Sequence, residues 1–186
     1  MAVNYQLELE RELQKNEGKT PRLLLHCCCA PCSSYVLEYL SPHFSITAHY
    51  YNPNIDTPEE YAHRARELSR FVQEMPLPGA VDVLAEPYTP AEFYAAVKGL
   101  EDIPEGGRRC YECYRLRLRR AAQAAAAGGY DYFTTTLSIS PHKNAVWLGE
   151  LGEAFAAEYG VRWLPSDFKK KNGFKRSTEL AARYGL

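Results

Sequence analysis

Cysteine is absent from all but two short stretches of this sequence, and long apolar runs are absent altogether. All six cysteines fall within residues 26–32 and 110–113. No apolar stretch approaches the roughly 20 residues of a membrane-spanning helix, and residues 1–15 contain no signal-peptide core. These absences argue against a secreted disulfide scaffold and against a membrane protein. We therefore expect a soluble, cytoplasmic protein with no membrane partner.

The chain also lacks internal repeats, low-complexity linkers and a large net charge. Its 186 residues favour one domain, and its formal net charge is −1. Basic residues are nevertheless concentrated in two clusters. The first contains Arg108, Arg109, Arg115, Arg117, Arg119 and Arg120, and the second contains Lys169, Lys170, Lys171, Lys175 and Arg176. Either cluster alone fits a solvated helix face, but both together favour a polyanionic partner.

Apolar runs and helical spacing alternate along the chain and predict an α/β fold. Strands are expected at residues 22–26, 44–51, 81–85, 130–134 and 161–164. Helices are expected at residues 33–40, 57–74, 90–98, 111–127, 144–159 and 177–184. This alternation predicts a mostly parallel five-stranded sheet flanked by helices, Rossmann-like or nucleotide-hydrolase-like. We expect residues 1–20 to form an N-terminal helical extension and residues 21–186 a single catalytic domain.

Three polar segments come directly after predicted strands. The first cysteine cluster follows the first strand, Asn52 and Asn54 follow the second, and residues 134–144 follow the fourth. In open α/β sheets, ligands bind beyond the carboxyl ends of the strands, where the strand order reverses. If the first and fourth strands are neighbours, all three segments edge one cleft.

Residues 27–29 are three consecutive cysteines, an arrangement that suits a metal better than a disulfide. Neighbouring cysteines form a disulfide only with strained geometry, whereas converging thiolates bind zinc, copper(I) or iron–sulfur clusters. Cys110 and Cys113 are expected to open a helix, where unpaired N–H groups and nearby arginines favour thiolates. A C-x-x-C pair and two further thiols complete a four-thiolate site. A structural zinc site remains the alternative, although six thiols exceed what it uses.

Residues 29–32 also fit a different chemistry. A strand followed by Cys-Ala-Pro-Cys and a helix resembles the redox turn of thioredoxin-like proteins, with Cys29 and Cys32 exchanging disulfides. Against this alternative, a thioredoxin fold needs none of the other four cysteines. Cys28 also stands where an aromatic residue is typical. A thiol–disulfide oxidoreductase is therefore the second hypothesis, and a non-catalytic, zinc-stabilised RNA-binding module is the third.

Two later segments carry candidate substrate-binding residues. Residues 134–144 combine hydroxyl groups with His142 and Lys143 near a helix start, which suits phosphate or sugar oxygens. For any single residue there, ordinary helix capping or a turn role is the better explanation, whereas His142 and Lys143 favour a functional role for the segment as a whole. Asp167 follows the fifth strand, where it can accept a hydrogen bond from a substrate or cap a helix. His26 is expected to support the site structurally.

Six segments, taken in order, resemble the QueH-type epoxyqueuosine reductases. They are LLHCCCAPCS at residues 24–33, YNPNI at 51–55, RCYECYRLR at 109–117, FTTTL at 133–137, SPHKN at 140–144 and DFKK at 167–170. The resemblance extends over nearly the whole chain. It implies the last step of queuosine biosynthesis, in which the epoxide of epoxyqueuosine in tRNA is reduced to queuosine without cobalamin.

The resemblance also implies cofactors and partners. It implies a 4Fe–4S cluster and an additional iron or zinc ion near Cys32, with Cys27 as a spectator. The implied cluster ligands are Cys28, Cys29, Cys110 and Cys113. The implied partners are an external electron donor and the anticodon loop of a tRNA with epoxyqueuosine at the wobble base.

Further roles combine the resemblance with these positions. The expected catalytic residues are Cys32, Asp167 and His142. The expected substrate- and tRNA-binding residues are Asn52, Asn54, Arg109, Arg115, Thr135, Ser140, Lys143, Lys169 and Lys170. Relatives commonly continue past the equivalent of Tyr184 into a Tyr-Cys-Gly-Cys tail with a redox-active disulfide. The present sequence ends at Leu186 without that pair.

Overall fold

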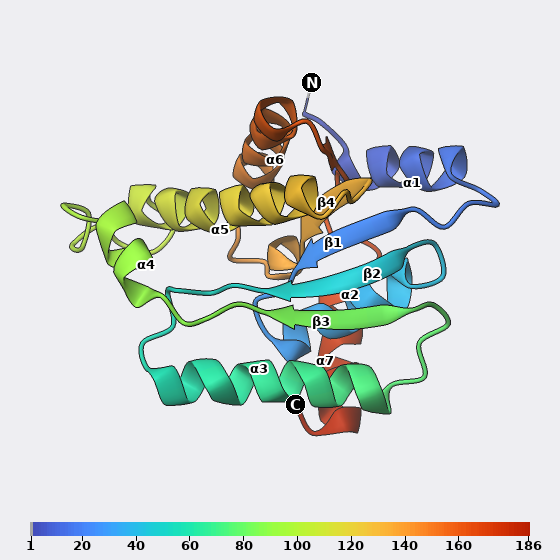
Figure 1. Ribbon diagram of the computed structural model, residues 1–186, viewed down its shortest axis with the longest axis horizontal. Helices are drawn as coiled ribbons and strands as arrows, with labels where there is room; N and C mark the ends of the chain where they lie inside the picture. Colours follow the sequence, from blue (N-terminus) through green and yellow to red (C-terminus); the bar gives the residue numbers. More distant parts are fainter. Residues whose placement is uncertain (1) are drawn as a thin grey trace.

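The computed structural model describes residues 2–186, and a five-stranded parallel sheet forms its centre (Figure 1). The strands are β1 (Arg22–His26), β2 (Ser45–Tyr50), β3 (Val81–Ala85), β4 (Tyr132–Thr135) and β5 (Arg162–Trp163). They lie in the order β3-β2-β1-β4-β5, and each neighbouring pair is parallel. The predicted fold class is confirmed, and the predicted bounds of β1 and β3 are correct.

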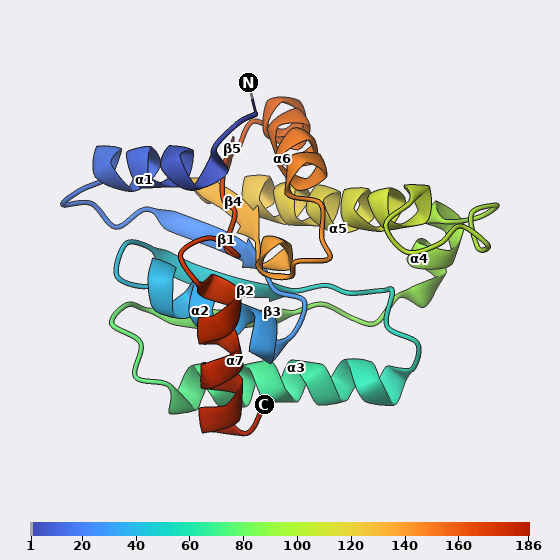
Figure 2. The same ribbon diagram turned by 180° about the vertical axis from the view of Figure 1, so that it is seen from behind.

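Helices cover both faces of this sheet, with α2, α3 and α7 on one face and α5 and α6 on the other (Figure 1 and Figure 2). The helices are α1 (Tyr5–Lys15), α2 (Ala30–Leu40), α3 (Pro58–Glu74), α4 (Pro90–Ala96), α5 (Arg108–Ala127), α6 (Ala145–Tyr159) and α7 (Gly173–Tyr184). A short 3-10 turn, η1 (Leu137–Ile139), follows β4. No helix within residues 2–186 has the length and apolar character needed to span a bilayer.

The central strand β1 supplies side chains to two separate hydrophobic clusters. Leu23 and Leu25 belong to the cluster beneath α2, α3 and α7, whereas Leu24 belongs to the cluster beneath α5 and α6. This division follows from the two-residue period of a strand. All three leucines are fully buried, and each buried leucine stabilises the fold by about 1.5–3 kcal/mol. A strand buried on both faces explains the continuous apolar run in the sequence.

Helix α1 packs against the hydrophobic cluster that contains Leu23 and Leu25. Leu9 is fully buried in the cluster that contains Leu23. The side chain of Asn16 at the end of α1 donates a 3.0 Å hydrogen bond to the hydroxyl of Tyr132 in β4. The division of the chain at residue 20 stays a prediction.

Local capping signals explain where the principal helices begin and end. Thr57 accepts a 3.2 Å hydrogen bond from the N–H of Glu60, so α3 begins directly after it. Helix α5 ends in a Schellman turn, in which Gly129 has a positive φ of 68° and the N–H of Tyr130 bonds to Ala125 O. Because Tyr130 belongs to this turn, β4 begins two residues later than the apolar pattern predicts.

Three helices begin earlier than expected, and one of them is α2, which starts at Ala30 rather than residue 33. Helix α5 starts at Arg108 rather than residue 111, and α7 starts at Gly173 rather than residue 177. A Cβ atom at Gly173 would lie 1.8 Å from Phe168 O and 2.6 Å from the ring of Tyr35. The first turn of α7 therefore requires glycine for this close approach, which the periodicity of the sequence does not reveal.

Candidate metal and substrate site

A cleft of about 240 Å³ lies at the carboxyl ends of β1, β2 and β4. Strands β1 and β4 are neighbours, as a shared cleft requires. The polar segments predicted after β1, β2 and β4 all contribute residues to its lining. Its lining residues are Cys28, Cys29, Cys32, Asn52, Asn54, Ile55, Arg64, Arg117, Leu137, Ser140 and Lys143. This is the point at which the strand order reverses, the usual ligand position in such sheets.

Three thiols meet in this cleft. The sulfur atoms of Cys28, Cys29 and Cys32 all lie within 4.8 Å of one another, and those of Cys28 and Cys29 are 3.9 Å apart. Cys29 is the extended N-cap residue of α2, and Pro31 lies in the first helical turn. Within residues 2–186, no other three potential ligands from Cys, His, Asp and Glu converge so closely. Soft sulfur donors of this kind can hold a metal.

The three thiols do not ionise independently. Hydrogen bonds from Cys29 and Cys32, together with the nearby charge of Arg117, lower the pKa of Cys28. The same hydrogen bond to Cys28 raises the pKa of Cys29 to about 12, and the pKa of Cys32 is raised for the same reason. The hydrogen bonds thus stabilise a single thiolate, that of Cys28. Binding of a metal to all three sulfur atoms would release the protons of Cys29 and Cys32.

The second cysteine pair lies in an adjoining pocket of about 320 Å³. Cys110 and Cys113 occupy the first turns of α5, and the N–H of Gly106 donates a 3.3 Å hydrogen bond to the sulfur of Cys110. Both cysteines line this pocket, together with Glu105 of the loop before α5. The residues that line both pockets are Asn54, Arg117 and Lys143.

This arrangement divides the predicted ligand set. Cys28 and Cys29 lie within ligand distance of Cys32, whereas Cys110 and Cys113 are not part of that group. The assignment of the four cluster ligands stays a prediction. Cys27, expected to be a spectator, is fully buried and lines neither pocket.

Arg117 is a site residue that the sequence analysis missed. Its side chain is buried, with 4 % exposure, and Nη1 donates a 3.3 Å hydrogen bond to Asn52 Oδ1. Asn52 in turn donates a 2.9 Å hydrogen bond to the carbonyl of Cys27. The spacing along α5 could have indicated this residue. Arg117 follows Cys110 by seven residues and Cys113 by four, which places all three on one face of the helix.

His26 and Thr135, the last residues of β1 and β4, form buried hydrogen bonds next to the cleft. His26 Nε2 lies 2.9 Å from the carbonyl of Tyr51, and Nδ1 lies 2.9 Å from Thr135 Oγ1. A carbonyl only accepts, so Nε2 carries the proton and the Thr135 hydroxyl donates to Nδ1. Burial, with a smaller effect of Arg117, lowers the pKa of His26 to about 3 and keeps the ring neutral. Thr135 also accepts a hydrogen bond from Leu137 N–H, is buried and lines neither pocket, so its substrate-binding role stays a prediction.

The other predicted residues after β2 and β4 are divided between cleft and surface. Asn52, Asn54, Ser140 and Lys143 line the cleft as expected. His142 is exposed, lines neither pocket, and contributes its backbone N–H to a hydrogen bond with Ser140 Oγ. The structure therefore gives His142 no position beside the thiols.

The segment after β5 lies outside both pockets. Asp167 is buried and forms a 2.6 Å ion pair with Lys169, while Lys170 is exposed. Lys171 of the same basic cluster is paired with Glu10 of α1. Much of the positive charge in this cluster is thus already balanced by carboxylates.

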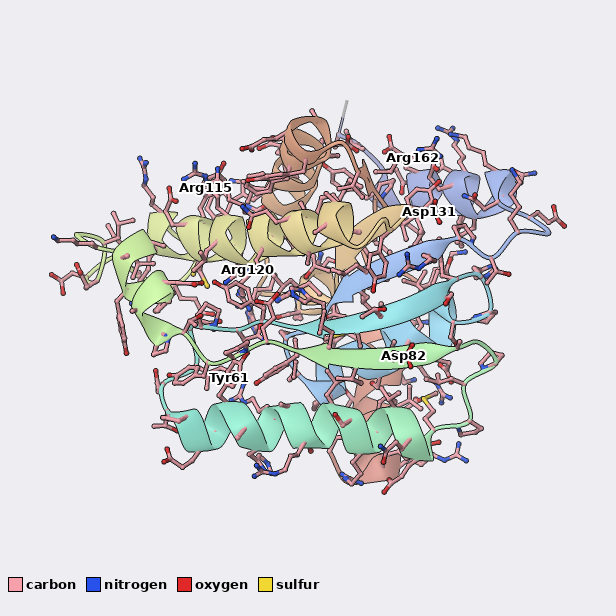
Figure 3. All side chains as sticks on the ribbon, in the orientation of Figure 1. Tyr61, Asp82, Arg115, Arg120, Asp131 and Arg162 are labelled. Carbon is pink, nitrogen blue, oxygen red and sulfur yellow. The ribbon has the colours of Figure 1, made fainter. Side chains whose placement is uncertain are left out.

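The arginines of α5 point in different directions (Figure 3). Arg109 lines the second pocket and donates a 3.1 Å hydrogen bond to the carbonyl of Glu101. Arg115 is exposed on the outer side of the helix and pairs with Glu112 at 3.3 Å, whereas Arg120 lies on the side that faces the sheet. Of the two predicted RNA contacts on α5, only Arg109 borders the site.

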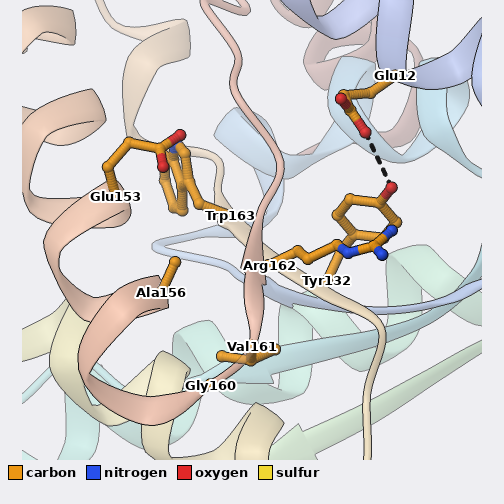
Figure 4. A pocket seen from close by; sticks show the side chains of 8 residues that line it. All are labelled: Glu12, Tyr132, Glu153, Ala156, Gly160, Val161, Arg162 and Trp163. Carbon is orange, nitrogen blue, oxygen red and sulfur yellow. Dashed lines mark hydrogen bonds between the residues drawn. The ribbon is translucent and has the colours of Figure 1, made fainter.

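A separate pocket of about 380 Å³ lies at the opposite ends of β4 and β5 (Figure 4). Its residues are Glu12, Tyr132, Glu153, Ala156, Gly160, Val161, Arg162 and Trp163. The Tyr132 hydroxyl donates a 2.9 Å hydrogen bond to Glu12 there. This pocket contains no thiol, and it lies at the amino ends of the strands, away from the switch point.

Comparison with known proteins identifies the family. The family model described as "Epoxyqueuosine reductase QueH" matches residues 23–186, which include both cysteine clusters. The chain belongs to the QueH family. This result confirms the resemblance inferred from the sequence motifs.

QueH relatives from three bacteria match most of this chain. A protein of Streptococcus pyogenes serotype M1 is 40% identical over 188 residues, covering 99% of this chain and 74% of its own length. One from Staphylococcus epidermidis is also 40% identical, covering 99% of this chain and 80% of its own length. One from Thermotoga maritima is 31% identical over 88% of this chain and 83% of its own. All three bear the name epoxyqueuosine reductase QueH.

A solved structure supports the fold of this QueH chain. It is described as a predicted subunit of tRNA methyltransferase from Methanocaldococcus jannaschii, with a TM-score of 0.54 and 11% identity. The match covers 86% of this chain and 74% of the other. At this identity the likeness concerns the α/β architecture alone.

Proposed function

We propose that this chain reduces the epoxide of epoxyqueuosine in tRNA to queuosine, as the name of its relatives describes. One observation carries the proposal: three thiols converge at the switch-point cleft of a chain that belongs to the QueH family. The overall change removes the epoxide oxygen as water and leaves an alkene, which consumes two electrons and two protons. The enzyme is an oxidoreductase that needs no cobalamin.

The thiols fit an iron–sulfur centre by their donor chemistry. We propose that Cys28, Cys29, Cys110 and Cys113 hold a 4Fe–4S cluster and that Cys32 holds an additional iron or zinc ion. An iron–sulfur cluster, when bound, transfers electrons singly from an external donor. Of the three candidate catalytic residues, Cys32 alone lines the cleft.

The chain's own polar groups suit the RNA substrate. Lys143 borders both pockets, and Arg64 and Arg109 each border one, so three cations face the space around the thiols. Cations at these positions neutralise phosphates of an anticodon loop, and an unstacked base enters more easily than a paired one. Ser140 and Asn54 offer hydrogen bonds inside the cleft.

The thiol–disulfide alternative is less well supported. Cys29 and Cys32 are close enough for exchange chemistry, but the sulfur of Cys28 lies 3.9 Å from that of Cys29 and would compete for the same disulfide. Membership of the QueH family favours the reductase over this alternative.

The direct test is turnover of modified tRNA. Protein reconstituted without oxygen is mixed with tRNA that carries epoxyqueuosine and with dithionite, and the digested nucleosides are analysed by mass spectrometry. We expect queuosine to form with the wild-type chain and not with Cys28→Ala. Unchanged epoxyqueuosine, with insulin disulfides reduced instead, would favour the thiol-exchange hypothesis.

A further inference from the structure

Arg117 carries a buried positive charge that no carboxylate balances. Within residues 2–186, no ion pair within 4.0 Å involves its guanidinium, and its Nε atom is buried without a hydrogen-bond partner. Its one side-chain partner is the neutral amide of Asn52. Arg120, three residues later, differs because it pairs with both Glu86 and Glu92.

An unpaired buried charge is unfavourable unless a nearby anion compensates for it. Arg117 lies in the wall that the two thiol pockets share, with Cys28, Cys29 and Cys32 on one side and Cys110 and Cys113 on the other. Asp56 and Glu105 also line the second pocket, but both are exposed and neither pairs with Arg117. The thiolates are therefore the anions placed to balance this cation.

We propose that Arg117 is the counter-charge of the thiolate-bound metal centre and sets its reduction potential. This inference rests on the proposed function, because it assumes that the thiols bind a redox-active metal. A centre held by several thiolates is negatively charged, and reduction adds one more negative charge. A fixed cation nearby stabilises the reduced form more than the oxidised form, particularly where burial limits solvent screening. Arg117 is thus a positioning and electrostatic residue, without contact to the reacting carbons.

The position on α5 is consistent with this role. Arg117 follows the two cysteines of the C-x-x-C pair on the same helix face, so the thiols and the cation are held by one rigid element. The hydrogen bond to Asn52, which itself donates to Cys27 O, links the guanidinium to the loop that carries Cys28, Cys29 and Cys32. Both groups of thiols therefore lie around one charge.

The test is the midpoint potential of the reconstituted centre, measured by an anaerobic redox titration that is followed by electron paramagnetic resonance. Arg117→Met removes the charge but keeps most of the apolar stem. We expect a potential more negative than that of the wild type at unchanged iron and sulfide content. Arg117→Lys keeps the charge and should remain near the wild type. Arg108→Met is the matched control, because that arginine is on the same helix with its side chain 73% exposed, and its removal should leave the potential unchanged.

A second variant covers the case in which Arg117→Met fails to fold. Asn52→Asp places a negative charge beside Nη1 while Arg117 stays in place, and it should move the potential further in the negative direction than the neutral Asn52→Leu, which loses the same hydrogen bond to Cys27 O. An unchanged potential in Arg117→Met, or equal potentials in Asn52→Asp and Asn52→Leu if Arg117→Met is unfolded, would overturn the inference and leave the proposed function intact. A wild-type chain that binds no redox metal would instead contradict the proposed cofactor.

Discussion

The side-chain amide of Asn52 donates a 2.9 Å hydrogen bond to the backbone carbonyl of Cys27. This contact joins the end of β2 to the beginning of the thiol loop after β1. The amide oxygen of Asn52 accepts from Arg117 of α5, so one buried side chain connects three elements around the cleft. The position of the thiols depends on this connection.

Replacing Asn52 by alanine should destabilise the fold. The substitution leaves the carbonyl of Cys27 and the guanidinium of Arg117 buried without these partners. Unsatisfied buried groups of this kind cost about 1–3 kcal/mol in the free energy of unfolding. Urea denaturation measures the change. Gln123→Ala is the control, since its exposed hydrogen bond to Tyr159 should contribute less than about 0.5 kcal/mol. Equal stabilities of the two variants would contradict the account.

Thr135→Val should reduce stability without affecting metal content. The hydroxyl of Thr135 bonds to His26 Nδ1 and to the N–H of Leu137, so valine leaves two buried groups unsatisfied. We expect a loss of about 1–3 kcal/mol in the free energy of unfolding. A thermal or urea melt measures stability, and metal analysis of the same preparation provides the comparison. Wild-type stability with weaker tRNA binding would instead support the substrate-binding role expected from the sequence.

Adjacent cysteines should differ sharply in their effect on metal binding. Cys28→Ala removes a thiol from the converging group and should strongly lower the metal content. Cys27→Ala should leave it near the wild-type level, because Cys27 is buried in the core and donates to the carbonyl of Leu25. Metal per chain is measured after identical anaerobic reconstitution. Metal loss in Cys27→Ala with the fold intact would show that the spectator role is wrong.

Lys143 should contribute directly to tRNA affinity. It borders both pockets and forms no ion pair within the described residues 2–186. Lys143→Ala should weaken binding and reduce the slope of log K against log salt concentration by about 1, because one phosphate contact is lost. Filter binding at several salt concentrations measures the slope. Lys171→Ala, which removes a cation already paired with Glu10, is the control. An unchanged slope in Lys143→Ala would place that lysine outside the RNA contact.

The strands, and the thiols that follow the first of them, could be predicted from the sequence because they depend on local sequence pattern. The buried run Arg22–His26 and the cysteines directly after it place thiols at the carboxyl end of a parallel strand. Asn144 caps α6 by accepting from the N–H of Trp147, as its position before a periodic segment suggests. The family motifs supplied the rest of the prediction, including the reaction.

The contacts that divide the site were not readable from the sequence, because they depend on tertiary packing. Arginine is usually exposed, so nothing local marks Arg117 as buried. The hydroxyl of Thr135 is engaged by His26, which is 109 residues away in the chain. The ion pair between Lys169 and Asp167 likewise depends on the conformation of the segment after β5.

The most direct test of the central claim is the metal content and visible spectrum of protein purified without oxygen. We predict about four irons and four sulfides per chain, with a broad absorbance at roughly 400 nm that dithionite bleaches. A colourless protein that retains only zinc after attempted iron–sulfur reconstitution would contradict the claim that these thiols form a redox centre.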